Sequence, residues 1–199
     1  LLDFENSIDN AIVIHEEDDY KCLCEIGNDV KRNIVSSGES VVGDVDAVLK
    51  ECDVVLERDY HTKANAQAMM ETMRSYCYID TYGRLNCVSS TQIPFHVRRI
   101  LSNALEIPKS KINVIKPRIG GGFGAKQTAC CEIFTAFVTW KLKKPSKIVY
   151  TREETFAATN SRHEMKMHVR IGAKKDGTIE AININTISNQ SAYAQQNPT

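Results

Sequence analysis

The feature that most restricts how this chain can fold is a glycine-rich stretch at residues 118–127, Arg-Ile-Gly-Gly-Gly-Phe-Gly-Ala-Lys-Gln. Residues 112–116, just before it, alternate in polarity and predict a strand, whereas residues 126–143 are almost uniformly apolar and predict a helix. We therefore expect the glycines to form a strand-to-helix turn. Glycine permits positive φ there and leaves the backbone open to an approaching molecule.

Two interpretations of this turn remain open on physical grounds. Free N–H groups at the start of a helix carry partial positive charge and bind phosphate or another anion. Alternatively, the turn only packs a helix against a sheet. The known dinucleotide and phosphate motifs do not match, because the third glycine of the first is missing and Lys126 is followed by Gln127. Phe123 is not needed for a turn, so we interpret it as a residue that contacts a ligand or closes a pocket.

The other patterns predict a mixed α/β fold of the α+β type. Residues 112–116, the glycine turn, a helix at 126–143 and a strand at 147–151 form one βαβ unit. Antiparallel hairpins are predicted at residues 72–91 and 166–188, each closed by a glycine-containing turn.

Three further elements complete the predicted fold. A helix is expected at residues 44–52 with Asp44 or Asp46 as its cap, a strand at residues 53–61, and a helix that begins at Pro94 and ends at Leu105.

The predicted helix at 126–143 has an unusual surface. Its only polar side chains before the C-terminal lysines form one thin line, at Thr128, Glu132, Thr135 and Thr139. A helix that is apolar almost all round is normally buried by its neighbours. We therefore predict that this helix is enclosed by the rest of the fold.

The composition excludes several classes of protein. The 199 residues include 25 basic and 25 acidic side chains, which gives a formal charge of zero, so we expect no nucleic acid as a partner. There is no apolar run of about eighteen residues and no visible leader, so we expect no membrane association.

The seven cysteines are an odd number without a Cys-x-x-Cys pair, which favours a reduced, cytoplasmic setting and no zinc or iron–sulfur ligands. Cys77 and Cys87 lie on facing runs of a predicted hairpin and could approach each other.

The glycine-rich stretch closely resembles the cofactor loop of the molybdenum hydroxylases, the family of xanthine dehydrogenase and aldehyde oxidase. Three other segments resemble motifs of that family in the same order: residues 89–92 (Ser-Ser-Thr-Gln), 150–154 (Tyr-Thr-Arg-Glu-Glu) and 161–163 (Ser-Arg-His), where Glu164 replaces a proline. The resemblance implies that residues 1–40 are a connecting arm. It also implies that residues 41–199 are the N-terminal part of a molybdenum-cofactor-binding domain.

The resemblance also implies roles for individual residues. Gln92 would contact an oxo ligand of the molybdenum, and Gly122, Phe123 and Gly124 would bind the molybdopterin-type cofactor through backbone groups. Gln127 would stand at the substrate position, where purine-oxidising members have a glutamate. An amide can hydrogen-bond a heterocycle but cannot take up a proton near neutral pH.

Residues just before the first predicted hairpin are less informative. Glu71 lies where the family has a glutamate near the wall of the substrate channel, but a lone glutamate at the start of a strand favours solvent, and we predict it to be solvated. Met69, Met70 and Met73 are predicted to fill the core.

The resulting hypothesis is an oxidoreductase that hydroxylates an N-heterocycle, purine-like, or an aldehyde with oxygen from water. The resemblance implies iron–sulfur clusters and FAD on other domains or subunits, a small-molecule substrate, and no catalytic residue in this chain, which we expect to be a fragment. Such a half-site is expected to self-associate and to be inactive alone. A nucleotide- or phosphate-binding module and a non-catalytic assembly domain remain as alternatives.

Overall fold

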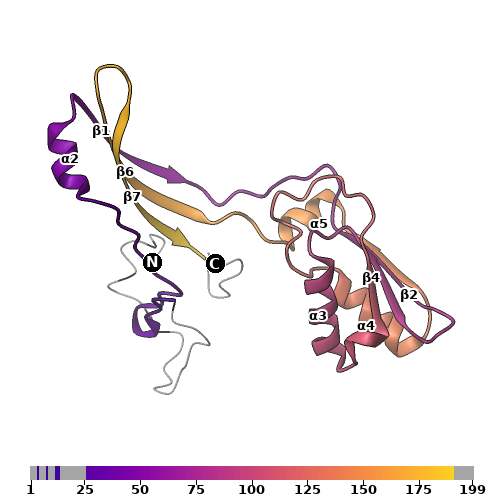
Figure 1. Ribbon diagram of the computed structural model, residues 1–199. Coiled ribbons are helices and arrows are strands. Elements are labelled where there is room, and N and C mark those ends of the chain that lie inside the picture. The colour runs from indigo at the N-terminus through magenta and orange to yellow at the C-terminus, as the bar shows by residue number, and fades with distance from the viewer. Residues whose placement is uncertain (1–3, 5–7, 9–11, 14–25, 191–199) are drawn as a thin grey trace. The chain divides into compact units, whose positions relative to one another are not determined.

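A computed structural model describes residues 4, 8, 12, 13 and 26–190 of the chain (Figure 1). The chain divides into two compact units, which are described separately. The first unit contains Leu1–Ala64 and His163–Thr199, and the second contains Asn65–Arg162. Most of the predicted connecting arm lies outside the described residues.

The second unit is a four-stranded mixed sheet with helices packed on one face (Figure 1). The strand order is β4-β3-β2-β5. The strands are β2 (Arg74–Ile79), β3 (Leu85–Ser89), β4 (Ile112–Ile115) and β5 (Ser146–Val149). The helices are α3 (Pro94–Leu105), η2 (Lys109–Lys111), α4 (Glu132–Leu142) and α5 (Arg152–Ala157).

The local predictions for this unit are largely confirmed. β2 and β3 pair as the expected hairpin, Cys77 lies directly opposite Cys87, and Gly83 adopts φ 72° in the connecting turn. Both cysteines are free thiols buried in the core. The helix α3 begins at Pro94 and ends at Leu105 as predicted, because proline suits the first helical position, where its missing N–H is not needed.

The predicted βαβ unit has a different topology from the expected one. β4 and β5 lie at opposite edges of the sheet, with β3 and β2 between them. The neighbouring parallel pair is instead β3 and β4, which α3 connects. The crossover through α4 spans the whole sheet, since β2 already occupies the place beside β3.

The predicted start of the helix after the glycine turn is wrong. α4 begins at Glu132, not at residue 126 or 127. The amide of Lys126 donates to the side chain of Gln92, and the amide of Cys130 donates to the Glu132 carboxylate at 2.8 Å. These side-chain acceptors hold the intervening residues in turns, and the regular helix starts only behind them.

The predicted burial of α4 is also wrong. Its polar side chains face the sheet and its apolar side chains face outward, whereas the apolar face of a helix normally packs on the core. The polar residues Glu132, Thr135 and Thr139 are buried against the sheet. The Thr139 hydroxyl donates to the carbonyl of Cys77 at 3.2 Å. The apolar face is exposed instead, with Phe134, Phe137, Val138 and Leu142 between 40% and 64% accessible.

Two apolar clusters form the core of the second unit. The larger joins the sheet to α3 and α4 through Cys77, Leu85, Cys87, Val97, Leu101, Ile112 and Ala136. The smaller lies beneath the glycine turn and consists of Met69, Met73, Ala125 and Cys131. Met69 and Met73 thus fill the core as predicted, but Met70 is 93% exposed, and the prediction for it is wrong.

The first unit is a three-stranded antiparallel sheet in the order β1-β6-β7. Its elements are η1 (Val30–Arg32), α2 (Val45–Glu51), β1 (Val54–Thr62), β6 (Glu164–Ala173) and β7 (Ile179–Asn189). Of the two predicted caps of α2, the structure has Asp44, whose side chain accepts the Ala47 amide. The predicted hairpin of β6 and β7 is confirmed, with Gly177 at φ 88° in its turn.

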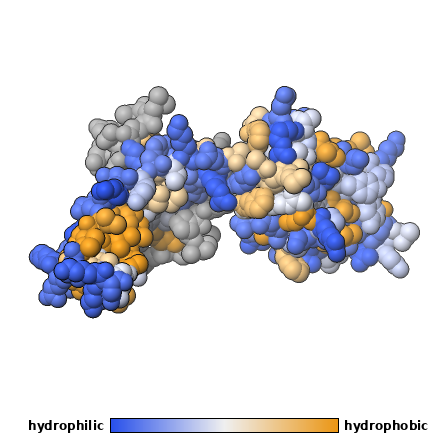
Figure 2. All heavy atoms as spheres, turned by 90° about the horizontal axis from the view of Figure 1, so that it is seen from above, coloured by the Kyte–Doolittle hydropathy of each residue, from blue (hydrophilic) through white to orange (hydrophobic). Residues whose placement is uncertain are grey.

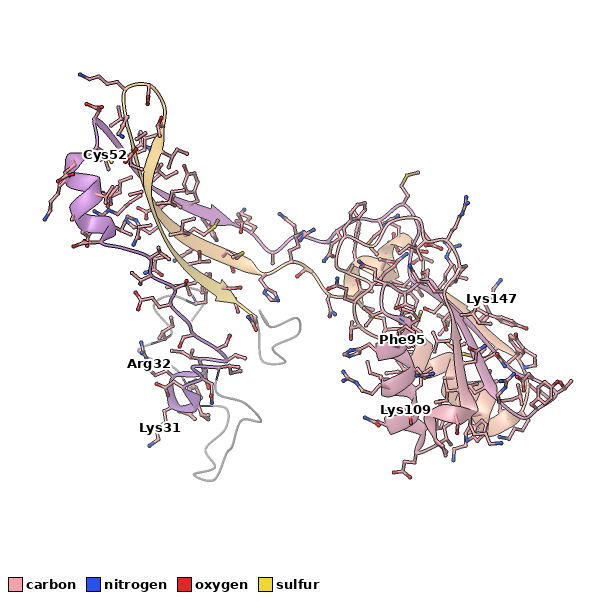
Figure 3. All side chains as sticks on the ribbon, viewed as in Figure 1. Lys31, Arg32, Cys52, Phe95, Lys109 and Lys147 are labelled. Carbon is pink, nitrogen blue, oxygen red and sulfur yellow. The ribbon has the colours of Figure 1, made fainter. Side chains whose placement is uncertain are left out.

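The two faces of this sheet differ in what covers them. α2 packs on one face, where Leu49 and Cys52 lie against Gly172 (Figure 3). On the opposite face Ile171 lies between Leu56 and Ile182 in register, and the last two are 55% and 48% exposed. Apolar side chains gather on the surface of this unit (Figure 2). Among the described residues, no helix is long and apolar enough to cross a membrane.

The short helix α5 offers a direct test of local structure. Thr151 accepts the amide of Glu154 at 3.1 Å, and Glu154 accepts the amide of Thr151 at 2.7 Å, which together form a capping box. Replacing Thr151 with alanine is expected to lower the free energy of unfolding by about 1 kcal/mol. Urea unfolding should show this loss, whereas Thr151→Ser should retain most of the wild-type stability, because serine keeps the accepting oxygen. Equal losses in both variants would contradict the capping role.

Candidate functional site

The glycine turn has a tightly wound backbone. Gly121, Phe123 and Gly124 all adopt positive φ, at 96°, 49° and 89°. This conformation is strained for Phe123, which has a side chain, at about 1–3 kcal/mol. Its ring is 60% exposed and lies against Gly121, where an added Cβ would be 2.9 Å from Cε2 of the ring. A strained and exposed phenylalanine at this position is consistent with a residue that contacts a ligand.

Gln92 holds this turn from the short segment between β3 and α3. Its side-chain oxygen Oε1 accepts the amides of Gly124 at 3.1 Å and Lys126 at 3.3 Å. The backbone amide of Gln92 donates to the carbonyl of Lys126 at 2.9 Å. The fit is so close that a Cβ at Gly122 would lie 2.6 Å from Cδ of Gln92. The structure therefore brings together the four predicted cofactor-binding residues, Gln92, Gly122, Phe123 and Gly124.

The hydrogen bonds of the turn leave three consecutive donors unused. The amide of Gly120 donates to Glu71, and the amide of Ala125 donates to the carbonyl of Gly122. Among the described residues, the amides between them at 121, 122 and 123 have no hydrogen-bond partner, nor has Nε2 of Gln92. Backbone amides seldom remain unpaired away from water. These donors suit a ligand that carries oxygen atoms or negative charge.

Glu71 is not solvated as predicted but is paired at the base of the turn. Its carboxylate accepts the amide of Gly120 at 2.7 Å and the ammonium of Lys126 at 2.9 Å, and Arg74 lies 3.3 Å from its other oxygen. Burial raises the pKa of Glu71, but the Gly120 amide and the Lys126 ammonium outweigh this effect, so that its pKa is lowered. The carboxylate is therefore ionised at neutral pH. No local pattern predicts that Glu71 pairs with Lys126, because 55 positions separate the two residues.

Two arginines from the segments that resemble family motifs also contact this region. Arg162 donates to the carbonyl of Phe123 at 3.1 Å, and Arg152 donates to the carbonyl of Met69 at 2.6 Å. The first bond fixes the turn itself, and the second fixes the backbone at Met69, which lies against Gly121 of the turn. Gln127, the predicted substrate residue, lies just after the turn and is exposed.

A second polar cluster lies on the sheet of the first unit. His168 contacts Asp59 at 2.7 Å and Glu57 at 3.0 Å, and the bond to Asp59 raises the pKa of this histidine. The cluster borders a hollow of about 470 Å³ that His61 and Lys166 also line. In the described part of the chain no group of three or more histidine, cysteine or acidic residues is arranged to hold a metal ion.

Comparison with known proteins identifies the family. The molybdopterin cofactor-binding domain family matches residues 26–199. The large molybdopterin subunit of nicotinate dehydrogenase from Eubacterium barkeri is 38% identical over 156 residues, which cover 78% of this chain and 37% of that protein. A probable hypoxanthine oxidase of Escherichia coli is 37% identical over 174 residues, which cover 87% of this chain and 18% of that protein.

Solved structures show the same fold. Aldehyde oxidoreductase from Desulfovibrio gigas superposes with a TM-score of 0.64 at 21% identity, over 73% of this chain and 16% of that one. CO dehydrogenase from Oligotropha carboxidovorans superposes with a TM-score of 0.60 at 28% identity, over 71% of this chain and 18% of that one. The sequence thus spans well under half of each relative. From the matched family and the arrangement of the glycine turn with Gln92, we conclude that this chain belongs to the molybdopterin cofactor-binding domain family.

Proposed function

We propose that this chain contributes one wall of the cofactor site in a xanthine dehydrogenase-like molybdenum hydroxylase. In this proposal residues 41–199 are the N-terminal part of the cofactor-binding domain, and residues 1–40 are the arm that leads into it. The observation that supports it best is the row of unpaired amides at residues 121–123 beside the free Nε2 of Gln92.

The donors of the turn fit such a cofactor by their chemistry. The molybdenum and its pterin present oxygen and sulfur acceptors, and backbone amides and a side-chain amide are neutral donors that match them. When bound, the cofactor supplies the two-electron oxidation of the substrate, with oxygen from water. Gln92 would donate through Nε2 while its Oε1 holds the turn, and Gly122, Phe123 and Gly124 would present their backbone.

The substrate is proposed to be an N-heterocycle or, as the alternative, an aldehyde. The two curated relatives described above are named for nicotinate and hypoxanthine, which both contain ring nitrogens. Gln127 could donate to and accept from such a ring. It cannot act as a base, and hydroxylation needs one within hydrogen-bond reach of the attacking oxygen. We propose that the base comes from another part of a longer subunit.

The remaining parts of the proposal concern partners. Electrons would leave through iron–sulfur clusters and FAD on other domains or subunits, in a cytoplasmic enzyme without nucleic-acid or membrane partners. The apolar face around Ile171 and Ile182 would support self-association of the chain when it is expressed alone, because exposed apolar patches of this kind favour association.

The substitution Gln92→Glu tests the proposed cofactor role. Glutamate keeps an oxygen that can accept the amides of Gly124 and Lys126, but it replaces the Nε2 donor with a second, negatively charged oxygen. In the full-length subunit that contains this sequence, the molybdenum content per subunit is expected to fall about tenfold. Elemental analysis and the fluorescence of the released, oxidised pterin would measure this loss.

The matched control is Gln127→Glu. It makes the same chemical change at an exposed residue that we propose to contact the substrate. It should therefore leave the molybdenum content unchanged and alter the KM for heterocycles. A wild-type subunit that contains no molybdenum would refute the proposal. A Gln92→Glu subunit with full molybdenum content would refute the role of Gln92.

A further inference from the structure

The most deeply buried charge in the second unit lies beneath the glycine turn. The side chain of Lys126 is 1% exposed, although lysines are almost never fully buried unless they are paired. Among the described residues, its ammonium reaches one carboxylate, that of Glu71, at 2.9 Å. A buried ion pair is costly to form and is weak evidence for stability by itself. Its position suggests a more specific task.

The pair joins the two ends of the turn. The same oxygen of Glu71 accepts the amide of Gly120, where the turn begins, and the ammonium of Lys126, where it ends. The amide of Glu71 also donates to the carbonyl of Gly120 at 3.1 Å. The contact at this end is close, since a Cβ at Gly120 would lie 2.7 Å from Cβ of Glu71.

A second clamp acts on the same turn from the side of Gln92, which accepts the amides of Gly124 and Lys126. The two clamps satisfy the donors at residues 120, 124 and 126, and they leave those at 121, 122 and 123 unpaired. We propose that Glu71 and Lys126 are positioning residues that hold the glycine turn so that its three free amides are pre-organised for the cofactor. This inference rests on the proposed function for the identity of the ligand, but not for the ordering of the turn.

The substitution Lys126→Met is the main test, because methionine has a similar length but no charge and no donor. It leaves the Glu71 carboxylate with Gly120 and Arg74 as partners. The far end of the turn loses its bond to Glu71 and keeps its backbone bonds to Gln92. In the full-length subunit without cofactor, amide hydrogen exchange in a peptide spanning residues 118–128 is expected to accelerate about tenfold. Exchange in β6 and β7 should not change.

Two further variants separate positioning from general stability. Arg74→Gln removes the outer partner of Glu71, and the Arg74 side chain is 47% exposed. This variant should leave the exchange of the turn within about twofold of wild type, as expected for an exposed pair. The double variant Glu71→Gln with Lys126→Met should be no worse than Lys126→Met alone, because two residues that act as one unit are not additive.

Cofactor-loaded enzyme supplies a second readout. If the pair positions the turn, the kcat per bound molybdenum should fall in Lys126→Met, and the Mo(V) electron paramagnetic resonance signal should change, with KM affected less. Unchanged exchange at residues 118–128, or faster exchange spread over every peptide of the second unit, would overturn the inference. A molybdenum-free wild-type subunit would refute the proposed function instead, and the exchange comparison would still decide the role of the pair.

Discussion

Replacing Gly122 with alanine is expected to reduce the molybdenum content of the full-length subunit about 100-fold, more than the loss expected for Gln92→Glu. The added Cβ would lie 2.6 Å from both Cδ and Oε1 of Gln92, a distance that real Cβ atoms do not adopt. Either the glutamine or the turn must move. Overpacking of this kind costs about 1–3 kcal/mol, and here it also separates Oε1 from the amides of Gly124 and Lys126.

The measurement is the molybdenum-to-subunit ratio of purified Gly122→Ala enzyme, together with its unfolding free energy. The control is Gly38→Ala, which makes the same change where nothing lies within 4 Å of the new Cβ. The control should match wild type in both measurements. Wild-type molybdenum content in Gly122→Ala would show that the close contact between the turn and Gln92 is not needed for binding.

Thr135→Val is expected to destabilise the protein by about 1–3 kcal/mol, although it replaces a polar residue of a helix with an apolar one of the same shape. The Thr135 hydroxyl shares a hydrogen bond with that of Ser75, and both side chains are 2% exposed. Valine therefore leaves the Ser75 hydroxyl buried without this partner. Urea unfolding of the purified 199-residue protein would measure the loss.

Two controls make this prediction specific. Adding Ser75→Ala to Thr135→Val removes both hydroxyls, which should recover most of the lost stability. Phe137→Ser replaces an aromatic side chain on the exposed face of the same helix, where it is 51% accessible, and should cost less than about 0.5 kcal/mol. If Phe137→Ser proved the more damaging change, the observed orientation of α4 would be wrong.

The sequence alone determined the elements whose signals are local. The proline at residue 94 began α3, Asp44 capped α2, and glycines 83 and 177 closed the two hairpins. Each of these features depends on a few neighbouring residues, so it can be predicted from the local sequence. The grouping of Gln92 with the glycine turn also followed from the order of the segments that resemble family motifs.

Only the tertiary structure decided which face of α4 is buried, where that helix begins, and what Glu71 does. An apolar pattern predicts that burial of a helix face is favourable, but it does not predict which surface that face will contact. Here the sheet presents a hydroxyl and a carbonyl, and the threonines of α4 form hydrogen bonds with them. The pairing of Glu71 with Lys126 joins residues 55 positions apart, and it forms because β2 begins at the edge of the sheet where β4 ends. Contacts over such separations depend on how strands are ordered in the sheet, which local pattern does not encode.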